Sequence, residues 1–289
     1  MKKLLITGSN GFVGSYFINK YKNKYEIQTF SFLKDDISTL DFKDVNIVFH
    51  LSALVHQMGG ASAEEYERVN VTQTLELAKK AKESGVKHFV FMSTVKVYGE
   101  EIESKYSENS ACNPEDEYGK SKLEAERQLK VLESKTFKVS IIRTPIVYGY
   151  GVKANIKNLI NLVDKVSVLP FGNINNKRSM VYIGNLCHLV DVIIDKSRSG
   201  IFLATDDIPL STSMLIVLIA KYLNKKIYLF HIPLFETLLK IFKPLIHKRL
   251  YGNLEVDNTI TKRELNLTNP YTTEEGIKLM LAQKEYNKS

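Results

Sequence analysis

The chain has 289 residues, of which 44% are hydrophobic and 25% charged, a balance typical of a globular protein with a sizeable core. The net charge of +8 favours anionic partners such as nucleotides or sugar diphosphates, but no basic run of five or more residues indicates a nucleic-acid tail. Cys112 and Cys187 form no Cys-x-x-Cys motif and predict neither a disulfide nor a metal site. No apolar run has the length of a signal peptide or a membrane span, so we expect a cytoplasmic protein.

The first half of the chain alternates β-rich segments with helical segments. Short hydrophobic runs predict strands over residues 3–8, 25–32, 45–53, 87–94 and 137–145. Helices are expected between them, over residues 11–23, 64–85 and 118–134. This alternation requires crossover connections, and it therefore predicts an α/β fold with a doubly wound parallel sheet.

The second half has a different rhythm. A helix is expected over residues 155–166, a strand running into a helix over 178–185, and a last buried strand over 200–206. Beyond about residue 205 helices predominate. We expect the sheet domain to comprise residues 1–147 and about 181–204. A smaller, mainly helical lobe would comprise about 148–180 and 205–289.

Three glycines stand between the first strand and the first helix. In "LLITGSNGFVGSYF" they are Gly8, Gly11 and Gly14, at intervals of three residues. The first allows a tight turn, the second lets backbone approach a pyrophosphate, and the third lets helix and strand pack closely. The free N–H groups of the helix N-terminus attract the anion. The pattern predicts that the sheet domain binds a dinucleotide, although a plain strand-to-helix turn also uses glycine.

The end of the second strand bears on which dinucleotide is bound. A carboxylate there would accept a hydrogen bond from the ribose 2′-hydroxyl and favour NAD(H). In "EIQTFSFLKDD" no carboxylate occupies the expected strand end, and Ser31 with Lys34 would tolerate a 2′-phosphate. We therefore expect NADP(H), with NAD(H) as the alternative. Asp36 and Ile37 would lie at the adenine edge.

A tyrosine precedes a lysine by four residues at three places, Tyr16, Tyr118 and Tyr222. Tyr118 is distinguished by its surroundings, because it opens a helix after a proline-containing loop and follows the strand that ends in Thr94. Lys122 lies on the same helix face, one turn later. A neighbouring ammonium would lower the pKa of the phenol and prepare it for proton transfer. Tyr118 is therefore the predicted catalytic residue.

The motifs "TGSNGFVG", "HLSAL", "STVKVYG" and "YGKSK" together resemble the extended short-chain dehydrogenase/reductase family, and "IIRTPIVYG" and "RSMVYIGNL" extend the resemblance over most of the chain. The resemblance implies a Rossmann-type fold in which Thr94 bonds the reacting sugar oxygen, Tyr118 is the acid/base and Lys122 tunes it and holds the nicotinamide ribose. Arg178 would grip a nucleotide-sugar phosphate. Further cofactor contacts are expected from Asn10, Phe12, Val13, Leu51, Ser52, Ala53, Ser93 and Pro145.

The family contains dehydratases, epimerases and ketoreductases of nucleotide sugars. Dehydratases usually carry Asp-Glu after the catalytic threonine, whereas this chain has Val95 and Lys96, which argues against dehydration. The resemblance is strongest to ketoreductases of surface-polysaccharide synthesis. It implies NADPH-dependent reduction, at carbon 4, of a UDP-4-keto-6-deoxy-N-acetylhexosamine to UDP-N-acetylfucosamine or UDP-N-acetylquinovosamine. A 4-epimerase with bound NAD is the alternative, and a non-catalytic NADP-sensing regulator a remote one.

Substrate contacts are less defined. His56 follows the strand over residues 45–53, and Asn155 begins a helix near the expected sugar, so both are candidate substrate contacts beside Arg178. Arg143 suits a structural ion pair as well as it suits a contact with the ligand. The basic and apolar stretches "NKKIYLF" and "KPLIHKRLY" are interpreted as packed helices with solvated lysines, with contact to a membrane surface as the less favoured reading. A UDP-linked substrate is expected, a lipid-linked one stays open, and a homodimer is a possible assembly.

Overall fold

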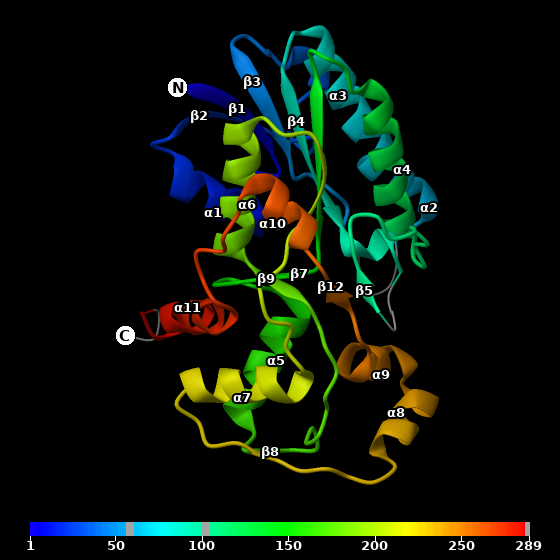
Figure 1. Cartoon of the computed structure of the whole chain (residues 1–289), viewed down its shortest axis with the longest axis vertical. Helices are drawn as coiled ribbons and strands as arrows, with labels where there is room; N and C mark the ends of the chain where they lie inside the picture. The colour runs from blue at the N-terminus through cyan, green and yellow to red at the C-terminus, as the bar shows by residue number, and fades with distance from the viewer. Residues whose placement is uncertain (56–60, 100–103, 287–289) are drawn as a thin grey trace.

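A computed structural model of the chain describes residues 1–55, 61–99 and 104–286. Within these residues the core is a six-stranded parallel sheet in the order β10-β6-β4-β3-β1-β2. The strands are β1 (Lys2–Thr7), β2 (Tyr25–Phe30), β3 (Val45–His50), β4 (His88–Thr94), β6 (Lys138–Thr144) and β10 (Gly200–Leu203). The expected Rossmann-type doubly wound sheet is confirmed (Figure 1).

Helices cover both faces of the sheet because its strands are apolar on both sides. Leu4 and Ile6 of β1 face one cluster, which includes α1 (Phe12–Tyr21) and α6 (Ile183–Lys196). Leu5 between them faces the opposite cluster, with α3 (Gln73–Glu83) and α4 (Glu117–Leu132). Side chains alternate along a strand, so near-continuous hydrophobic runs bury both faces. Figure 1 shows the two helix layers on opposite sides of the sheet.

The helix expected over residues 64–85 is interrupted. It consists of α2 (Ala63–Tyr66), the π-helical turn η2 (Glu67–Thr72) and α3. Asn70 lies in the π turn and is buried, with its amide bonded to the backbone of Leu54 rather than to solvent. Single π turns occur often at functional sites, and here the wide turn accompanies a side chain turned towards the loop after β3.

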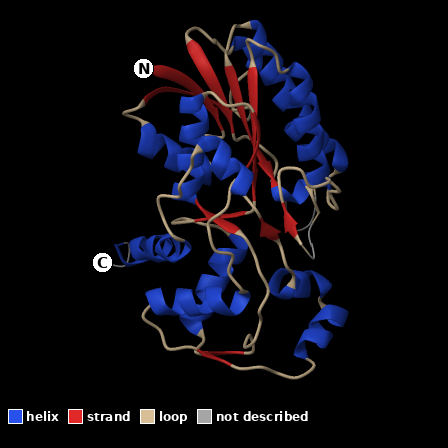
Figure 2. Cartoon of the chain, viewed as in Figure 1, coloured by secondary structure: helices blue, strands red, loops and turns tan. Residues whose placement is uncertain are grey.

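The other part of the molecule lies beyond the carboxyl ends of the strands and is mainly helical (Figure 2). Its helices are α5 (Ala154–Lys165), α7 (Thr212–Tyr222), α8 (Phe235–Phe242), α9 (Pro244–Tyr251) and α11 (Thr273–Tyr286). The helix α10 (Thr259–Leu265) instead packs beside α6, next to the sheet (Figure 1). The chain reaches α5 after β6, returns to the sheet with α6 and β10, and leaves it again for α7. The exact limits of the two expected domains remain a prediction.

Short parallel pairs and 3₁₀ turns join these parts. The pairs are β7 (Ile146–Tyr148) with β9 (Met180–Tyr182), β8 (Val168–Leu169) with β11 (Tyr228–Leu229), and β5 (Lys105–Tyr106) with β12 (Glu255–Val256). The 3₁₀ turns are η1 (Ile37–Thr39) and η3 (Val95–Val97). Among the described residues, no helix is long and apolar enough to span a bilayer.

Candidate active site

The glycine turn between β1 and α1 is built around two close backbone approaches. Gly8 has φ +67°, and a Cβ there would lie 2.9 Å from the Ser52 nitrogen. A Cβ on Gly14 would lie 2.5 Å from the Gly8 carbonyl oxygen. Gly11 donates its N–H to that same oxygen at 3.0 Å and precedes α1, whose N-terminus no described side chain caps. The turn therefore leaves backbone N–H groups for an anion, as the expected pyrophosphate cradle requires.

Gly14→Ala should weaken dinucleotide binding at least about tenfold, because the added methyl forces α1 away from the turn and overpacking of this kind costs about 1–3 kcal/mol. Ser15→Ala, one residue later on the exposed side of α1, is the matched control. Calorimetric titration of each variant with NAD measures its affinity for the dinucleotide. Equal affinity for Gly14→Ala and wild type would show that the close packing of the turn does not matter for the cofactor.

A buried network that the sequence did not reveal fixes the segment after β3. The Thr7 hydroxyl oxygen accepts hydrogen bonds from the backbone N–H groups of Leu51 and Ser52, both at 3.1 Å. The same hydroxyl lies 2.7 Å from Nδ1 of His50, whose Nε2 lies 2.9 Å from the Thr74 hydroxyl. Burial lowers the pKa of His50 to about 3, so the imidazole stays neutral. The network holds Leu51 and Ser52, two of the expected cofactor contacts, against the glycine turn.

Asn70 extends this support to the catalytic helix. Its side-chain oxygen accepts from the Leu54 N–H at 2.8 Å, and its nitrogen donates to the Leu54 carbonyl at 3.0 Å and to the Ser121 hydroxyl at 3.0 Å. Ser121 lies in α4, between Tyr118 and Lys122. Asn70 therefore ties the loop that begins with Leu51, Ser52 and Ala53 to the helix of the predicted acid/base.

A carboxylate lies at the end of β2, where none was expected from the sequence. The chain turns back after Ser31, and Oδ2 of Asp35 accepts a hydrogen bond from the Ser31 N–H at 2.8 Å. Asp36 then caps η1 by accepting from the Ser38 N–H at 2.8 Å, a bond that lowers the pKa of Asp36. Ile37 follows and packs against the core. A carboxylate therefore reaches the strand end from four residues further along the chain, which weakens the argument for a 2′-phosphate.

Two neighbouring hydroxyls end β4, and they have different surroundings. Thr94 lies on the wall of the main cavity. The Ser93 hydroxyl instead donates to Oε1 of Glu126 at 2.5 Å, inside the protein. Glu126 also accepts from the Arg143 guanidinium, with 2.5 Å from Nη2 to Oε2, and both residues are almost fully buried. Adjacent strand residues point to opposite faces, so the Ser93 side chain makes a structural contact, and the expected contact of Ser93 with the cofactor stays a prediction. Arg143 is an ion-pair partner.

Tyr118 lies in the first turn of α4. Asp116 caps this helix by accepting from the Gly119 N–H at 2.7 Å, which fixes where the phenol points. Tyr118 is half-buried and lines the cavity together with Thr94. Burial, together with the Asp116 carboxylate and Tyr66, raises the pKa of the Tyr118 phenol above its ordinary value. The expectation of a phenol whose pKa is lowered by the lysine is not met by these surroundings.

Lys122 explains that difference. Its ammonium donates to the Met92 carbonyl oxygen at 2.9 Å and lies 4.4 Å from the centre of the Phe91 ring. It therefore faces the backbone of β4. Burial lowers the pKa of Lys122 to about 7, opposed by the carboxylate of Glu126. The positive charge of Lys122, which was expected to lower the pKa of Tyr118, is accordingly lost as the pH rises through neutrality. Burial of the phenol then keeps the pKa of Tyr118 raised.

The two positions that bear the acid/base pair in dehydratases are used for structure. Val95 is buried in an apolar cluster beside β4. Lys96 forms an ion pair with Asp116, with 2.5 Å between Nζ and Oδ2. Neither side chain can donate and accept the protons of an elimination, which supports the argument against dehydration.

The carboxyl end of the sheet opens into a cavity of about 860 Å³ between the sheet and the helical part. It brings together Thr94, Tyr118, Pro145, Asn155 and Arg178, which are far apart in the sequence. Its far wall is formed by the end of α8 and by α9. No residue of this wall was among the predicted site residues, yet it contributes the basic side chains Lys243, Lys248 and Arg249.

Arg178 links the two walls of the cavity. Its Nη1 donates to the carbonyl oxygens of Lys248 at 3.3 Å and Gly252 at 3.1 Å. Together with Arg249 it places two guanidinium groups on one cavity, an arrangement suited to a diphosphate. Asn155 is exposed at the start of α5. His56 lies outside the described residues.

The remaining expected cofactor contacts flank the glycine turn. Asn10 is exposed in the turn, whereas Phe12 and Val13 begin α1 and pack partly against the core. None of the turn residues lines the main cavity, so the candidate site has two regions: the glycine turn at the ends of β1, β2 and β3, and the cavity beyond β4 and β6. This is where ligands bind in open α/β sheets. In the described part of the chain, no group of three or more His, Cys, Asp and Glu residues could hold a metal ion.

Comparison with known proteins identifies the family. The model of the NAD dependent epimerase/dehydratase family matches residues 4–202, well over half of the chain. The chain belongs to this family. The resemblance seen in the motifs is thereby confirmed, and with it a nucleotide-sugar enzyme of the NAD-dependent epimerase/dehydratase type.

Two curated members of the family cover most of the chain. A UDP-glucose 4-epimerase of Vibrio cholerae is 38% identical, over 96% of this chain and 94% of its own length. An N-acetyl-alpha-D-glucosaminyl-diphospho-ditrans,octacis-undecaprenol 4-epimerase of Escherichia coli O157:H7 is 26% identical, over 80% of this chain and 75% of its own length. Among solved structures of the same fold, a dTDP-4-dehydrorhamnose reductase of Clostridium acetobutylicum has a TM-score of 0.81 at 22% identity, covering 98% of this chain and 99% of that one.

Proposed function

We propose that this member of the epimerase/dehydratase family is a 4-epimerase of a UDP-hexose or UDP-N-acetylhexosamine that keeps its NAD bound. The observation that carries the proposal is the 38% identity to a UDP-glucose 4-epimerase along nearly the whole of both chains. The second curated relative is also a 4-epimerase. The reductase function expected from the motifs has less support, because it depended partly on a strand end without a carboxylate, and Asp35 lies there.

The residues around the glycine turn fit NAD. A Cβ at Gly8 or Gly14 would meet protein backbone, so these glycines keep the turn tight, and the uncapped N-terminus of α1 leaves N–H groups for a pyrophosphate. The carboxylate of Asp35 would accept from the adenosine ribose, with Ile37 beside the adenine. Bound NAD supplies a hydride acceptor for carbon 4 and, in its oxidised form, a positive charge near the phenol.

Tyr118 and Thr94 handle the proton. Both line the cavity at the carboxyl end of the sheet, within one wall. Tyr118 takes the proton of the sugar 4-hydroxyl as carbon 4 is oxidised, and returns it when carbon 4 is reduced. Thr94 orients the oxygen by a hydrogen bond. Burial raises the pKa of Tyr118, so a positive charge nearby would favour the deprotonated form that accepts this proton.

The cavity suits a sugar diphosphate that must present either face of its carbon 4. Arg178 and Arg249 provide two guanidinium groups for the diphosphate, and charge-assisted hydrogen bonds hold it while the sugar is free to turn. A volume of about 860 Å³ leaves room for the sugar to turn. Asn155 would contact the nucleotide or the sugar from the start of α5.

The proposal is tested by purified protein without added cofactor. UDP-glucose, UDP-galactose and their N-acetylated forms are each incubated with it, and the products are separated by chromatography while reduced nicotinamide is followed by absorbance. Interconversion of a pair of 4-epimers, with no net consumption of nicotinamide and NAD released on denaturation, is expected. Absence of interconversion, combined with consumption of NADPH when a UDP-4-keto-6-deoxy sugar is supplied, would establish the reductase in its place.

Asp35→Asn should raise the relative affinity for NADP over NAD roughly tenfold or more, because the carboxylate at the strand end repels a 2′-phosphate across a few ångströms. Asp41→Asn, in the exposed segment after η1, is the matched control. Competitive titration of each variant with the two dinucleotides measures the ratio. An unchanged ratio would mean that the ribose lies away from Asp35.

A further inference from the structure

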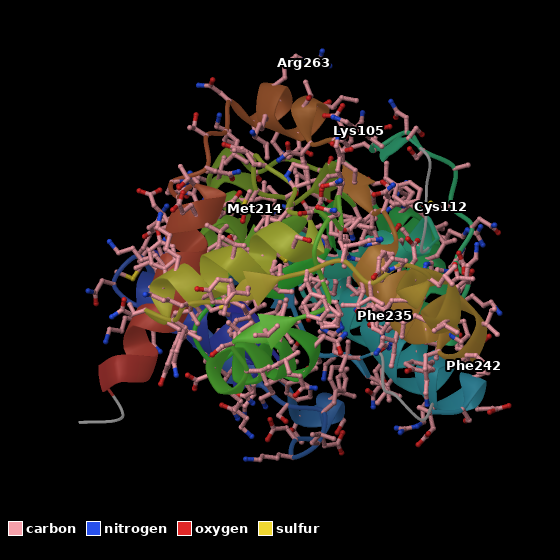
Figure 3. The ribbon with its side chains drawn as sticks, turned by 90° about the horizontal axis from the view of Figure 1, so that it is seen from below. Lys105, Cys112, Met214, Phe235, Phe242 and Arg263 are labelled. Carbon is pink, nitrogen blue, oxygen red and sulfur yellow. The ribbon has the colours of Figure 1, made fainter. Side chains whose placement is uncertain are left out.

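The helices α8 and α9 pack against each other at one corner of the helical part of the molecule (Figure 1), and apolar side chains of both are exposed. None of their residues, all of which the structure describes, is buried. Phe242 is 72% exposed and Leu245 is 67% exposed, and they are joined by further exposed residues: Leu234, Leu238, Ile241 and Ile246. In Figure 3 Phe242 lies at the outer rim of the molecule. Apolar residues gathered in this way mark an interaction surface rather than scattered exposure.

Most charged residues of the segment that carries this surface are basic, although one of them, Lys248, pairs with Glu115 outside the segment. Residues 230–252 contain four basic residues, Lys240, Lys243, Lys248 and Arg249, and one acidic residue, Glu236. Lys240 and Lys243 are exposed on the same two helices as the apolar residues. A helix that combines a basic side with exposed Leu, Ile and Phe is typical of segments that lie in the interface of an anionic bilayer.

We propose that the surface formed by residues 234–246 docks on an anionic lipid bilayer. Phe242, Lys243, Leu245 and Ile246 also line the mouth of the catalytic cavity, so docking would bring that mouth to the membrane surface. The inference does not depend on whether the enzyme epimerises or reduces its substrate. A second copy of the chain is a poorer partner, because a self-complementary contact would oppose two surfaces of the same charge.

Co-sedimentation with vesicles tests the proposal. Wild-type protein is mixed with vesicles of phosphatidylcholine alone or of phosphatidylcholine with phosphatidylglycerol, at low and at high salt. Binding to the anionic vesicles is expected, with little binding to the neutral ones and a loss at high salt, where charges are screened. Lys240→Ala should weaken binding roughly fivefold, since one basic residue near an anionic surface contributes on this scale. Leu238→Ser with Ile241→Ser should weaken it at least about tenfold.

Matched variants sit on α4, away from this surface. Lys130→Ala and Val131→Ser remove one exposed lysine and one exposed apolar side chain and should leave vesicle binding unchanged. The chain has no tryptophan, so Ile241→Trp reports directly on insertion. Its fluorescence should shift to the blue with anionic vesicles, whereas that of Val131→Trp should not. Because Leu238, Lys240 and Ile241 do not line the cavity, turnover of a soluble UDP-sugar should be unaffected by their replacement.

Three results would overturn the proposal. If wild-type protein stays in the supernatant when anionic vesicles are sedimented, this surface does not bind a bilayer. Equal binding of the Leu238→Ser/Ile241→Ser variant and the wild type would place the contact elsewhere. If the wild type elutes as a larger species than this variant in size exclusion without lipid, the surface belongs to a second copy of the chain.

Discussion

Tyr118→Phe should reduce turnover about 10²–10⁴-fold while leaving NAD binding intact, because it removes the one phenolic hydroxyl assigned to proton transfer. The phenyl ring keeps the packing of Tyr118 against Tyr66, whose ring centre lies 6.3 Å away. Steady-state kinetics with the preferred UDP-sugar measure the loss, and calorimetric titration measures NAD binding. The loss should fall on kcat rather than on KM, since the hydroxyl acts on the reacting oxygen.

The chain provides its own control for this prediction. Tyr222 has the same spacing to a lysine, Lys226, but lies on α7, where its hydroxyl donates to Glu274 at 2.8 Å. Tyr222→Phe should retain activity. If Tyr118→Phe turns over normally, or if both variants lose activity to the same extent, Tyr118 is not the acid/base.

Glu126→Gln should lower the free energy of unfolding by about 3–5 kcal/mol, because it leaves the buried guanidinium of Arg143 without its counter-charge. The substitution keeps the shape of the side chain, so the loss reports on charge. It also removes the group that opposes the fall in the pKa of Lys122. Denaturant unfolding followed by circular dichroism, with and without NAD, measures the effect.

Glu124→Gln is the matched control on the same helix. Glu124 forms an ion pair with Arg127 at 3.7 Å, and both side chains are largely exposed. Exposed pairs of this kind contribute about 0–1 kcal/mol, so this variant should be nearly as stable as the wild type. Comparable decreases in the free energy of unfolding of the two variants would show that the buried pair of Glu126 and Arg143 contributes no more to stability than the exposed pair.

The sheet and the glycine turn could be predicted from local sequence. The four inner strands, β6, β4, β3 and β1, are short, mostly buried hydrophobic runs, and such runs need no information from the rest of the chain. The same holds for Gly8 and Gly14, because only glycine fits where a Cβ would meet backbone at 2.9 and 2.5 Å. The order of the motifs sufficed to identify the family, which the match over residues 4–202 confirms.

Other features depend on residues that come together only in the folded chain. Asp35 reaches the end of β2 through a turn, whereas the prediction searched for a carboxylate only among the residues of the expected strand end. Lys122 shares a helix face with Tyr118, but burial and the Met92 carbonyl decide its orientation and charge. Arg249 reaches the cavity from α9, more than 100 residues after Tyr118. Spacing along one helix could predict none of these three.

The basic and apolar stretches near the C-terminus show the same limit. Hydrophobic residues in a helical pattern predicted a packed helix, because a pattern does not reveal whether a partner element is present. In the structure the first stretch, residues 224–230, forms a turn and the strand β11 rather than a helix, whereas the second, residues 243–251, contains α9, which leaves Leu245 exposed on the wall of the cavity. The proposed bilayer contact therefore agrees with the less favoured interpretation of "KPLIHKRLY", which was contact with a membrane surface.

The fate of the hydrogen on carbon 4 tests the proposed function most directly. A UDP-sugar carrying deuterium at carbon 4 is incubated with the enzyme in the presence of excess unlabelled NADH and NADPH, and its epimer is examined by mass spectrometry and NMR. If one bound NAD takes the hydride and returns it to the other face, the epimer retains deuterium at carbon 4. An epimer that carries hydrogen at carbon 4 would mean that the hydride exchanges with free nicotinamide, and it would contradict an epimerase that keeps its NAD bound.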